Sequence, residues 1–269
     1  MQSWQNTTTV GVDMKRRSLI RYTGAAALAA LGTGLSSQFQ SYQAQTGDAV
    51  TIQSLGHTCF LFSGSGRRIL VNPFQPIGCT SGYRAPTVSA DLVLISSLLL
   101  DEGVTTGLPG NPRVLADPGI YEFQNMQVQG IATDHDRNRG RRFGTNVVWR
   151  WNQGNLNIVH LGGAAAPITV EQQILIGRPD VLIVPVGGGV KAYNPDEAKV
   201  AINTLSPKVV IPSHYRTQAA DEAACDIQAL EAFLSIVDAP VRQVADSVTL
   251  SRGDLPAEGY RIDVVNYRF

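Results

Sequence analysis

Residues 180–188 read Asp-Val-Leu-Ile-Val-Pro-Val-Gly-Gly, an apolar run with the length of a buried strand that ends in glycines. The next segment, Asn194-Pro195-Asp196-Glu197, carries the capping signals of a helix that we expect to continue to Leu205. A second apolar strand is predicted from Lys208 to Ile211, and it leads directly into Pro212-Ser213-His214-Tyr215. This strand, helix, strand order is typical of an α/β sheet, in which functional side chains gather where strands end.

The chain before this unit is rich in short strands. Glycine-containing turns separate several of them, and one amphipathic helix is expected near the C-terminus, over residues 221–237. The expected strands cover residues 50–52, 59–62, 68–71, 92–95, 146–151 and 156–161. Two halves that each combine strands with helices predict a sandwich of two sheets with helices outside. No repeat or linker interrupts residues 45–269, which we interpret as a single domain.

Residues 1–44 are interpreted as a twin-arginine export signal and linker. Arg16 and Arg17 precede an Ala- and Gly-rich apolar run, from Tyr22 to about Ser37, that is too short to span a bilayer stably. A disordered arm with a chance arginine pair is the alternative. The expected destination is the periplasm or another extracytoplasmic compartment. Either Met1 or Met14 could be the start.

The charge balance argues against nucleic acid as a partner. The whole chain has 22 basic and 22 acidic side chains, and loss of residues 1–44 removes four of the former and one of the latter. The mature chain is therefore mildly acidic, which offers no steering toward nucleic acid or anionic lipid, and we expect no membrane insertion after the signal is removed.

Three cysteines and no Cys-x-x-Cys pair make a thiolate zinc site very poorly supported, so any metal must be held by histidine and carboxylate groups. In an exported protein Cys59 and Cys79 could pair as a disulfide. Cys225, on the expected helix, is interpreted as a small buried hydrophobe.

Four segments occur in an order that resembles the metallo-β-lactamase superfamily, specifically its branch similar to ascorbate-phosphate lactonases. They are Gly56-His57-Thr58-Cys59-Phe60-Leu61, His160-Leu161-Gly162-Gly163, residues 180–188 and Val209-Val210-Ile211-Pro212-Ser213-His214-Tyr215. The resemblance implies an α/β fold of four layers, an αββα sandwich of two mixed β-sheets flanked by helices. It also implies a metal site at one edge, between the sheets.

The metal motif of that family is largely missing. Residues 96–102 read Ser-Ser-Leu-Leu-Leu-Asp-Glu where the family has Ser-His-x-His-x-Asp-His. Only Asp101 survives, and Gly163 stands where the family carries an aspartate that bridges the two metals. The histidines are replaced by Ser97, Leu99 and Glu102. A dinuclear site with a bridging hydroxide cannot be built from what remains, which is Asp101, His135 and His214, with Glu102 as a substitute.

Three functions are compatible with this pattern. The one we expect is a pseudoenzyme without a metal cofactor, which uses the old cleft to bind a small molecule or a partner. The second is a residual hydrolase that holds one Zn or Mn ion through Asp101, His135 and His214 and acts on a small lactone, phosphoester or similar anionic substrate. The third is metal-free catalysis with Ser97 as nucleophile and His135 or His214 as base.

The expected pocket combines the surviving and the substituted positions. It comprises Ser97, Leu99, Asp101, Glu102, His135, Gly163 and His214, with Asp101 and Ser97 as the catalytic candidates. His57 and His160 do not fall on principal ligand positions, so we interpret them as structural or supporting residues. The sequence does not encode the identity of the ligand.

Overall fold

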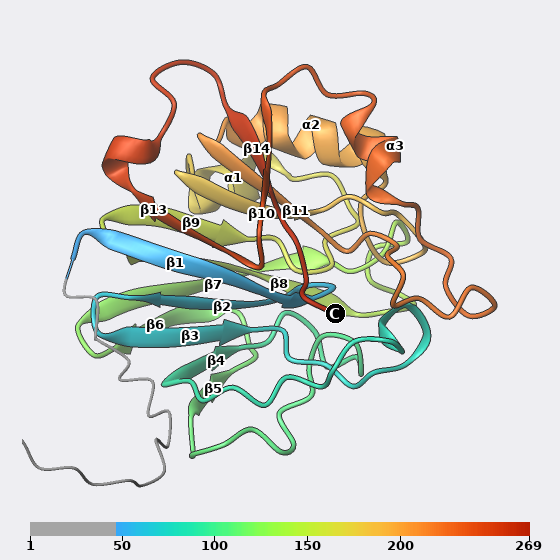
Figure 1. Cartoon of the computed structure of the whole chain (residues 1–269), viewed down its shortest axis with the longest axis horizontal. Coiled ribbons are helices and arrows are strands. Elements are labelled where there is room, and N and C mark those ends of the chain that lie inside the picture. The colour runs from blue at the N-terminus through green and yellow to red at the C-terminus, as the bar shows by residue number, and fades with distance from the viewer. Residues whose placement is uncertain (1–46) are drawn as a thin grey trace, which may run out of the picture. The chain divides into compact units, whose positions relative to one another are not determined.

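Two β-sheets packed face to face form the domain in the computed structural model, which describes residues 47–269 (Figure 1). The predicted signal segment lies outside the described residues. The first sheet has the order β13 (Ser247–Ser251), β1 (Ala49–Gly56), β2 (Cys59–Gly64), β3 (Arg67–Val71), β4 (Leu92–Leu94), β5 (Arg113–Leu115). The second sheet has the order β12 (Val241–Val244), β14 (Arg261–Val265), β11 (Val209–Ser213), β10 (Val181–Pro185), β9 (Leu156–His160), β8 (Thr145–Gln153), β7 (Met126–Asp134), β6 (Gly119–Phe123).

Both sheets mix parallel and antiparallel pairs. In the first sheet β2 pairs antiparallel with β1 and β3, whereas β4 is parallel to β3 and β5. In the second sheet β10 is parallel to β9 and β11, and the hairpin of β7 and β8 is antiparallel. The parallel strands β10 and β11 are the two that the run at 180–188 and the segment at 208–211 predicted.

The core follows from the alternation of side chains along the strands. Phe60 and Phe62 of β2 point between the sheets, where they meet residues such as Trp151 of the opposite sheet. Leu61 and Cys59, from the same strand, point to the outer face of the first sheet. The strands β10 and β11 are buried on both faces, which explains why their sequences are continuously apolar rather than alternating.

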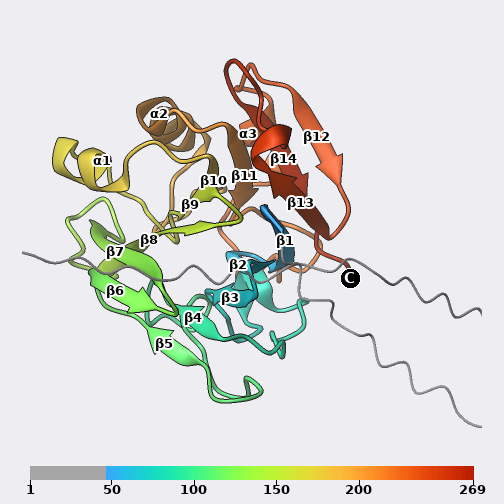
Figure 2. The same ribbon diagram turned by 90° about the vertical axis from the view of Figure 1, so that its left-hand side faces the viewer.

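Helices cover the outer face of the second sheet: α1 (Val170–Ile176), α2 (Pro195–Leu205) and α3 (Leu230–Leu234) (Figure 2). The helix α2 begins as predicted, with Asn194 and Glu197 forming a reciprocal capping box around Pro195. Loops and the short 3-10 helix η1 (Gly78–Thr80) cover the outer face of the first sheet, and a second 3-10 turn, η2 (Arg252–Asp254), follows β13. This is the two-sheet metallo-β-lactamase-like sandwich that the resemblance implied.

The expected helix over residues 221–237 is wrong in most of its length. Only Leu230–Leu234 is α-helical, and the preceding residues form turns around Cys225. The pairing of Cys59 with Cys79, which the sequence left open, does not form: Cys79 pairs with Cys225, with the two Cα atoms 4.7 Å apart, and Cys59 is a buried free thiol. The interpretation of Cys225 as a small buried hydrophobe on a helix is wrong, because Cys225 lies in the turns before α3 and is held by this disulfide, whereas Cys59 faces the apolar layer on the outside of β2.

No helix within residues 47–269 is both long and apolar enough to cross a membrane.

Candidate functional site

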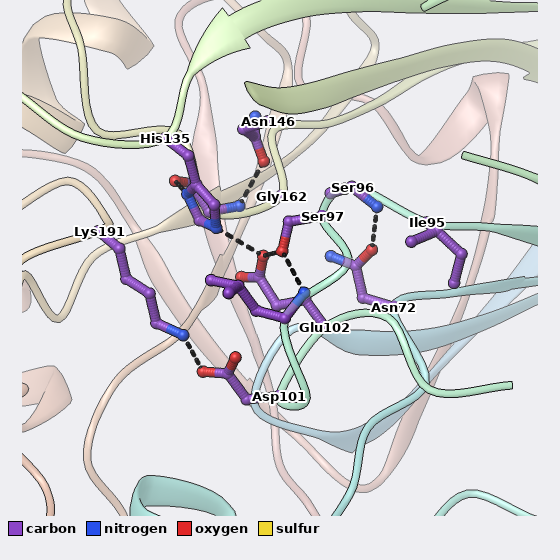
Figure 3. Close-up of polar contacts among 12 residues, drawn as sticks. Asn72, Ile95, Ser96, Ser97, Asp101, Glu102, His135, Asn146, Gly162 and Lys191 are labelled. Atoms are coloured by element: carbon purple, nitrogen blue, oxygen red, sulfur yellow. Dashed lines mark hydrogen bonds and ion pairs between the residues drawn. The ribbon is translucent and has the colours of Figure 1, made fainter. Parts of the chain in front are cut away.

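The expected pocket lies where loops leave several strands at one edge of the sandwich, as Figure 3 shows for its polar contacts. The loop of residues 96–103 follows β4, His135 follows β7, and Gly163 follows β9. Lys191 comes from the loop after β10, and His214 directly follows β11. The fold thus gathers side chains that are as much as about half the chain apart in sequence.

Asp101 lies at the centre of one group of side chains. His57, from the turn between β1 and β2, has its Nε2 atom 3.7 Å from an Asp101 carboxylate oxygen. The rings of His57 and His214 are in contact, with centroids 4.3 Å apart. One ligand atom from each of these three residues lies within 4.8 Å of the other two. They are the group in the described part of the chain whose geometry could hold a single metal ion.

Lys191 forms an ion pair with the one carboxylate of this group, that of Asp101. Its ammonium group makes a direct ion pair with Asp101 Oδ2 (Figure 3). Burial alone would raise the pKa of Asp101, but the neighbouring His57 ring and the Lys191 charge outweigh burial and hold that pKa well below its usual range. Burial and the nearby His57 lower the pKa of His214 to about 3. Asp101 is therefore ionised at neutral pH and His214 is uncharged.

A second group forms around Glu102, which is fully buried. Its Oε2 atom lies 3.2 Å from Nε2 of His135 and accepts a 2.9 Å hydrogen bond from the Ser97 hydroxyl. The other ring nitrogen of His135, Nδ1, lies 2.6 Å from the carbonyl oxygen of Gly163. His135 therefore faces an oxygen acceptor with each of its two nitrogens.

These contacts favour a charged His135. A carbonyl oxygen can only accept, so Nδ1 carries a proton, and the Glu102 carboxylate beside Nε2 favours a second proton there, which would make the ring an imidazolium. Burial opposes this charge, but the Glu102 carboxylate outweighs burial and raises the pKa of His135; in return His135 lowers the pKa of Glu102. A protonated imidazole has no lone pair to offer a metal ion.

The same pair, Glu102 and His135, limits the space around Gly163. A Cβ atom placed on Gly163 would lie 2.2 Å from His135 Cε1 and 2.7 Å from Glu102 Oε1. The ion pair thus fills the volume that an aspartate side chain at this position would need. The Glu102 and His135 pair therefore fits only because residue 163 has no side chain, and an aspartate at residue 163 would leave no room for it.

His160 is a structural residue in its contacts. Its Nε2 atom lies 3.0 Å from the carbonyl oxygen of Thr58, and its Nδ1 atom accepts a 3.0 Å hydrogen bond from the backbone of Gly162. Burial lowers its pKa to about 4, so the ring is neutral. Asn72, directly after β3, accepts a 2.8 Å hydrogen bond from the backbone N–H of Ser96 and thereby holds the start of the 96–103 loop.

The donors that remain do not fit a dinuclear metal centre. Ser97 donates its hydroxyl proton to Glu102, Leu99 has no donor, and Gly163 has no side chain. The carboxylates of Asp101 and Glu102 lie against the Lys191 ammonium and the His135 ring respectively. Basic side chains of the protein therefore lie where two carboxylates would otherwise need metal cations.

The three residues predicted to hold a metal ion, Asp101, His135 and His214, do not form one group in the structure. The structure brings Asp101 and His214 together but places His135 against Glu102, apart from them. His57, interpreted from the sequence as a supporting residue, lies with Asp101 and His214 instead. Ser97 does not have the partner that a nucleophile needs, since its hydroxyl bonds to a glutamate and not to a histidine. Lys191 was missed because an isolated lysine in a glycine-rich loop has no sequence signature.

Comparison with known proteins agrees with the fold. A family model of the beta-lactamase superfamily domain matches residues 51–214. A UPF0173 metal-dependent hydrolase from Thermoplasma acidophilum is 23% identical over 190 residues, covering 60% of this chain and 81% of that protein. Another protein of that description, from Pelotomaculum thermopropionicum, is 28% identical over 195 residues, covering 61% and 83% respectively.

A solved structure extends this similarity to three dimensions. It comes from Thermotoga maritima and is described as a Zn-dependent hydrolase of the metallo-β-lactamase superfamily. It is 30% identical, covers 80% of this chain and 98% of its own, and superposes with a TM-score of 0.64. The residues that the family model matches, 51–214, include the four side chains of the two ion pairs. The chain belongs to the metallo-β-lactamase superfamily.

Proposed function

We propose that this protein is a metal-independent member of its superfamily, a pseudoenzyme that has replaced metal ions by internal ion pairs and binds a small molecule instead of hydrolysing it. The observation that carries the proposal is the ion pair between Lys191 and Asp101, the one family ligand that the 96–102 motif retains. The His135 and Glu102 pair supports it, because the Glu102 carboxylate raises the pKa of His135 and so favours its protonated form.

Electrostatics explains why these pairs oppose metal binding. A divalent ion at Asp101 would have to displace Lys191 or lie beside its positive charge in a partly buried site, where Coulomb repulsion is stronger than in water. At His135 the ion would have to remove a proton that Glu102 stabilises. Without a metal, residues 47–269 lack the cation that would lower the pKa of a bound water toward neutrality.

One specific observation favours a second function. His57, Asp101 and His214 have the spacing and donor types of a mononuclear Zn or Mn site, and His214 is neutral. If Lys191 moved away from Asp101, these residues would hold one ion and leave a position open for water. The activity would then be hydrolysis of a small lactone, phosphoester or similar anionic substrate.

An assay of metal-dependent hydrolysis distinguishes the pseudoenzyme from the mononuclear hydrolase. Wild-type protein and His214→Ala would be assayed with γ-butyrolactone and with mono- and bis-(p-nitrophenyl) phosphate, each with Zn or Mn added. We expect equal, background rates for both proteins. Hydrolysis that requires added metal and disappears in His214→Ala would overturn the proposal and establish the mononuclear hydrolase.

The proposal includes export by the twin-arginine route. The disulfide between Cys79 and Cys225 supports an oxidising destination, since such bonds are rare in the cytosol. Replacing Arg16-Arg17 by Lys-Lys and following the protein by cell fractionation tests this part. We expect the variant to stay in the cytoplasm, and normal export of the variant would contradict the assignment.

A further inference from the structure

A cavity of about 290 Å³ adjoins the candidate site at His57. Its walls come from six separate parts of the chain: the β1–β2 hairpin, the loop after η1, the end of β11 with the residues that follow it, α3, β12, and β14 with the C-terminal residues. The wall mixes aromatic, aliphatic and polar side chains. The ones used below are His57, Tyr83, Tyr215, Arg216, Glu231 and Tyr267. Its volume is close to the lower end of the range of small-molecule pockets in proteins.

The aromatic wall is fixed in place. Tyr83 is buried, its hydroxyl forms a 2.8 Å hydrogen bond with the hydroxyl of Thr217, and its ring meets that of Tyr267 edge to face with centroids 4.7 Å apart. Gly56 makes this position of the ring possible, because a Cβ atom at residue 56 would lie 2.7 Å from the ring of Tyr83. A bulkier residue at 56 would push the wall away from His57.

The two loops that supply Tyr83 and Thr217 are also joined to each other. The disulfide of Cys79 and Cys225 links them, and the backbone N–H of Gly82 donates a 2.7 Å hydrogen bond to the carbonyl of Ala219. These crosslinks lie outside both sheets and connect the two loops that contribute Tyr83 and Thr217 to the cavity wall. A wall fixed in advance lowers the entropy cost of binding a ligand.

The charges beside the cavity indicate what it would bind. Arg216 is exposed at the lining, and within the described residues no ion pair or hydrogen bond of its guanidinium group is found. Arginine recognises carboxylates through paired N–H donors. Glu231 lines the same cavity. Burial is the largest cause that raises the pKa of Tyr215, and the negative charge of Glu231 raises it further. A hydrogen-bond donor on the ligand could point toward the Glu231 carboxylate.

We infer that this cavity binds a small aromatic carboxylate, with its ring packed against the wall that Tyr215 and Tyr267 help to form and its carboxylate on Arg216. The inference deepens the proposed function by giving the binding protein a site and a ligand class. It does not require a metal, because Arg216 and the tyrosines would hold the ligand, and His57, which lies in the group with Asp101 and His214, contributes only one wall.

Titration calorimetry with the full folded protein tests the inference, with 4-hydroxybenzoate as probe and 4-hydroxybenzyl alcohol as the matched compound without a carboxylate. We expect saturable binding of the acid and about tenfold weaker binding of the alcohol, the loss typical of one charge-assisted contact. Arg216→Gln should weaken the acid about tenfold and leave the alcohol unchanged. The control Arg141→Gln, an exposed arginine away from the cavity, should change neither.

Two results would overturn the inference: no saturable binding of the acid to wild-type protein at roughly 10 mM, a concentration at which even weak specific binding is measurable, or equal affinity in wild-type and Arg216→Gln protein. Tyr267→Leu provides a second variant, expected to weaken both probes alike. Metal-dependent hydrolysis together with binding at Arg216 would reject the proposed function and retain this site. Metal-free protein that binds neither probe would reject the site alone.

Discussion

Replacing Glu102 by Gln gives opposite results for the two views of the site. If Glu102 is one half of an internal ion pair, as its contact with His135 indicates, then the neutral variant loses a buried attraction and is less stable. If Glu102 were instead a ligand awaiting a cation, it would sit near Asp101 as a second, repelled carboxylate, and its neutralisation would stabilise the metal-free protein. The sign of the change in unfolding free energy is therefore informative.

The magnitude follows from the burial of the pair. Both side chains are completely inaccessible, and breaking a buried pair by removing one partner costs about 3–5 kcal/mol. Two effects reduce that cost: the His135 imidazole can release its proton near neutral pH, and the amide oxygen of Gln can still accept from Ser97. We expect a loss of about 2–3 kcal/mol, which lowers the melting temperature of a domain of this size by about 4–12 °C.

Urea unfolding in the presence of EDTA, followed by the fluorescence of the buried Trp149 and Trp151, measures the change. The matched control is Glu122→Gln, an exposed glutamate on β6, for which we expect a change within about 0.5 kcal/mol. A Glu102→Gln protein that is as stable as wild type in EDTA, or more stable, would refute the ion-pair interpretation.

The pH dependence provides a second readout of the same pair. The raised pKa of His135 adds stability that is complete below its unfolded value of 6.5 and is lost as pH rises through the folded value. The pKa of Glu102, lowered to about 2, adds stability that is complete above its unfolded value of 4.5 and is lost as pH falls through the folded value. The difference between wild type and Glu102→Gln should be greatest between these two unfolded values and should shrink in alkaline solution.

Three further variants test other parts of the account. Gly163→Asp restores the family residue but forces a Cβ atom against His135, so we expect it to lower stability by at least about 2 kcal/mol without creating a metal site, as measured by urea unfolding and Zn titration. Lys191→Met removes the ammonium group that pairs with Asp101, so we expect the affinity for Zn to rise at least tenfold. Competition with a chromogenic chelator measures this affinity, and an unchanged value would show that Lys191 does not prevent Zn from binding at Asp101. Cys79→Ser opens a loop that spans 146 residues and should cost about 2–4 kcal/mol by thermal unfolding, and equal stability would contradict a structural role for the disulfide.

The architecture was predictable because its signals are local or ordered along the chain. The continuous apolar runs of β10 and β11 and the capping residues of α2 indicate those elements directly. The helix expected over 221–237 failed because its polar and apolar spacing is helical, whereas the disulfide at Cys225 and the contacts with η1 determine the path of the chain there. Tertiary contacts of this kind leave no pattern in the sequence.

From the sequence, the candidate site could be described as a set of substitutions relative to the family pattern, but its contacts could not be predicted. The absent histidines and the glycine at 163 are visible in the 96–102 segment and in His160-Leu161-Gly162-Gly163. That Glu102 meets His135, and that Lys191 meets Asp101 across 90 residues, depends on where loops from different strands end. His57 joins Asp101 and His214 for the same reason, since the β1–β2 turn lies beside the end of β11.

The central claim is that side chains have replaced metal ions in this site. It is tested most directly by elemental analysis of tag-free protein purified without chelators, combined with its melting temperature before and after addition of Zn or Mn. We expect well under one metal ion per chain and a melting temperature that added metal leaves unchanged, because the cation positions are filled by Lys191 and His135. One tightly held Zn, Mn or Fe per chain, lost in both Asp101→Ala and His214→Ala, would contradict the claim.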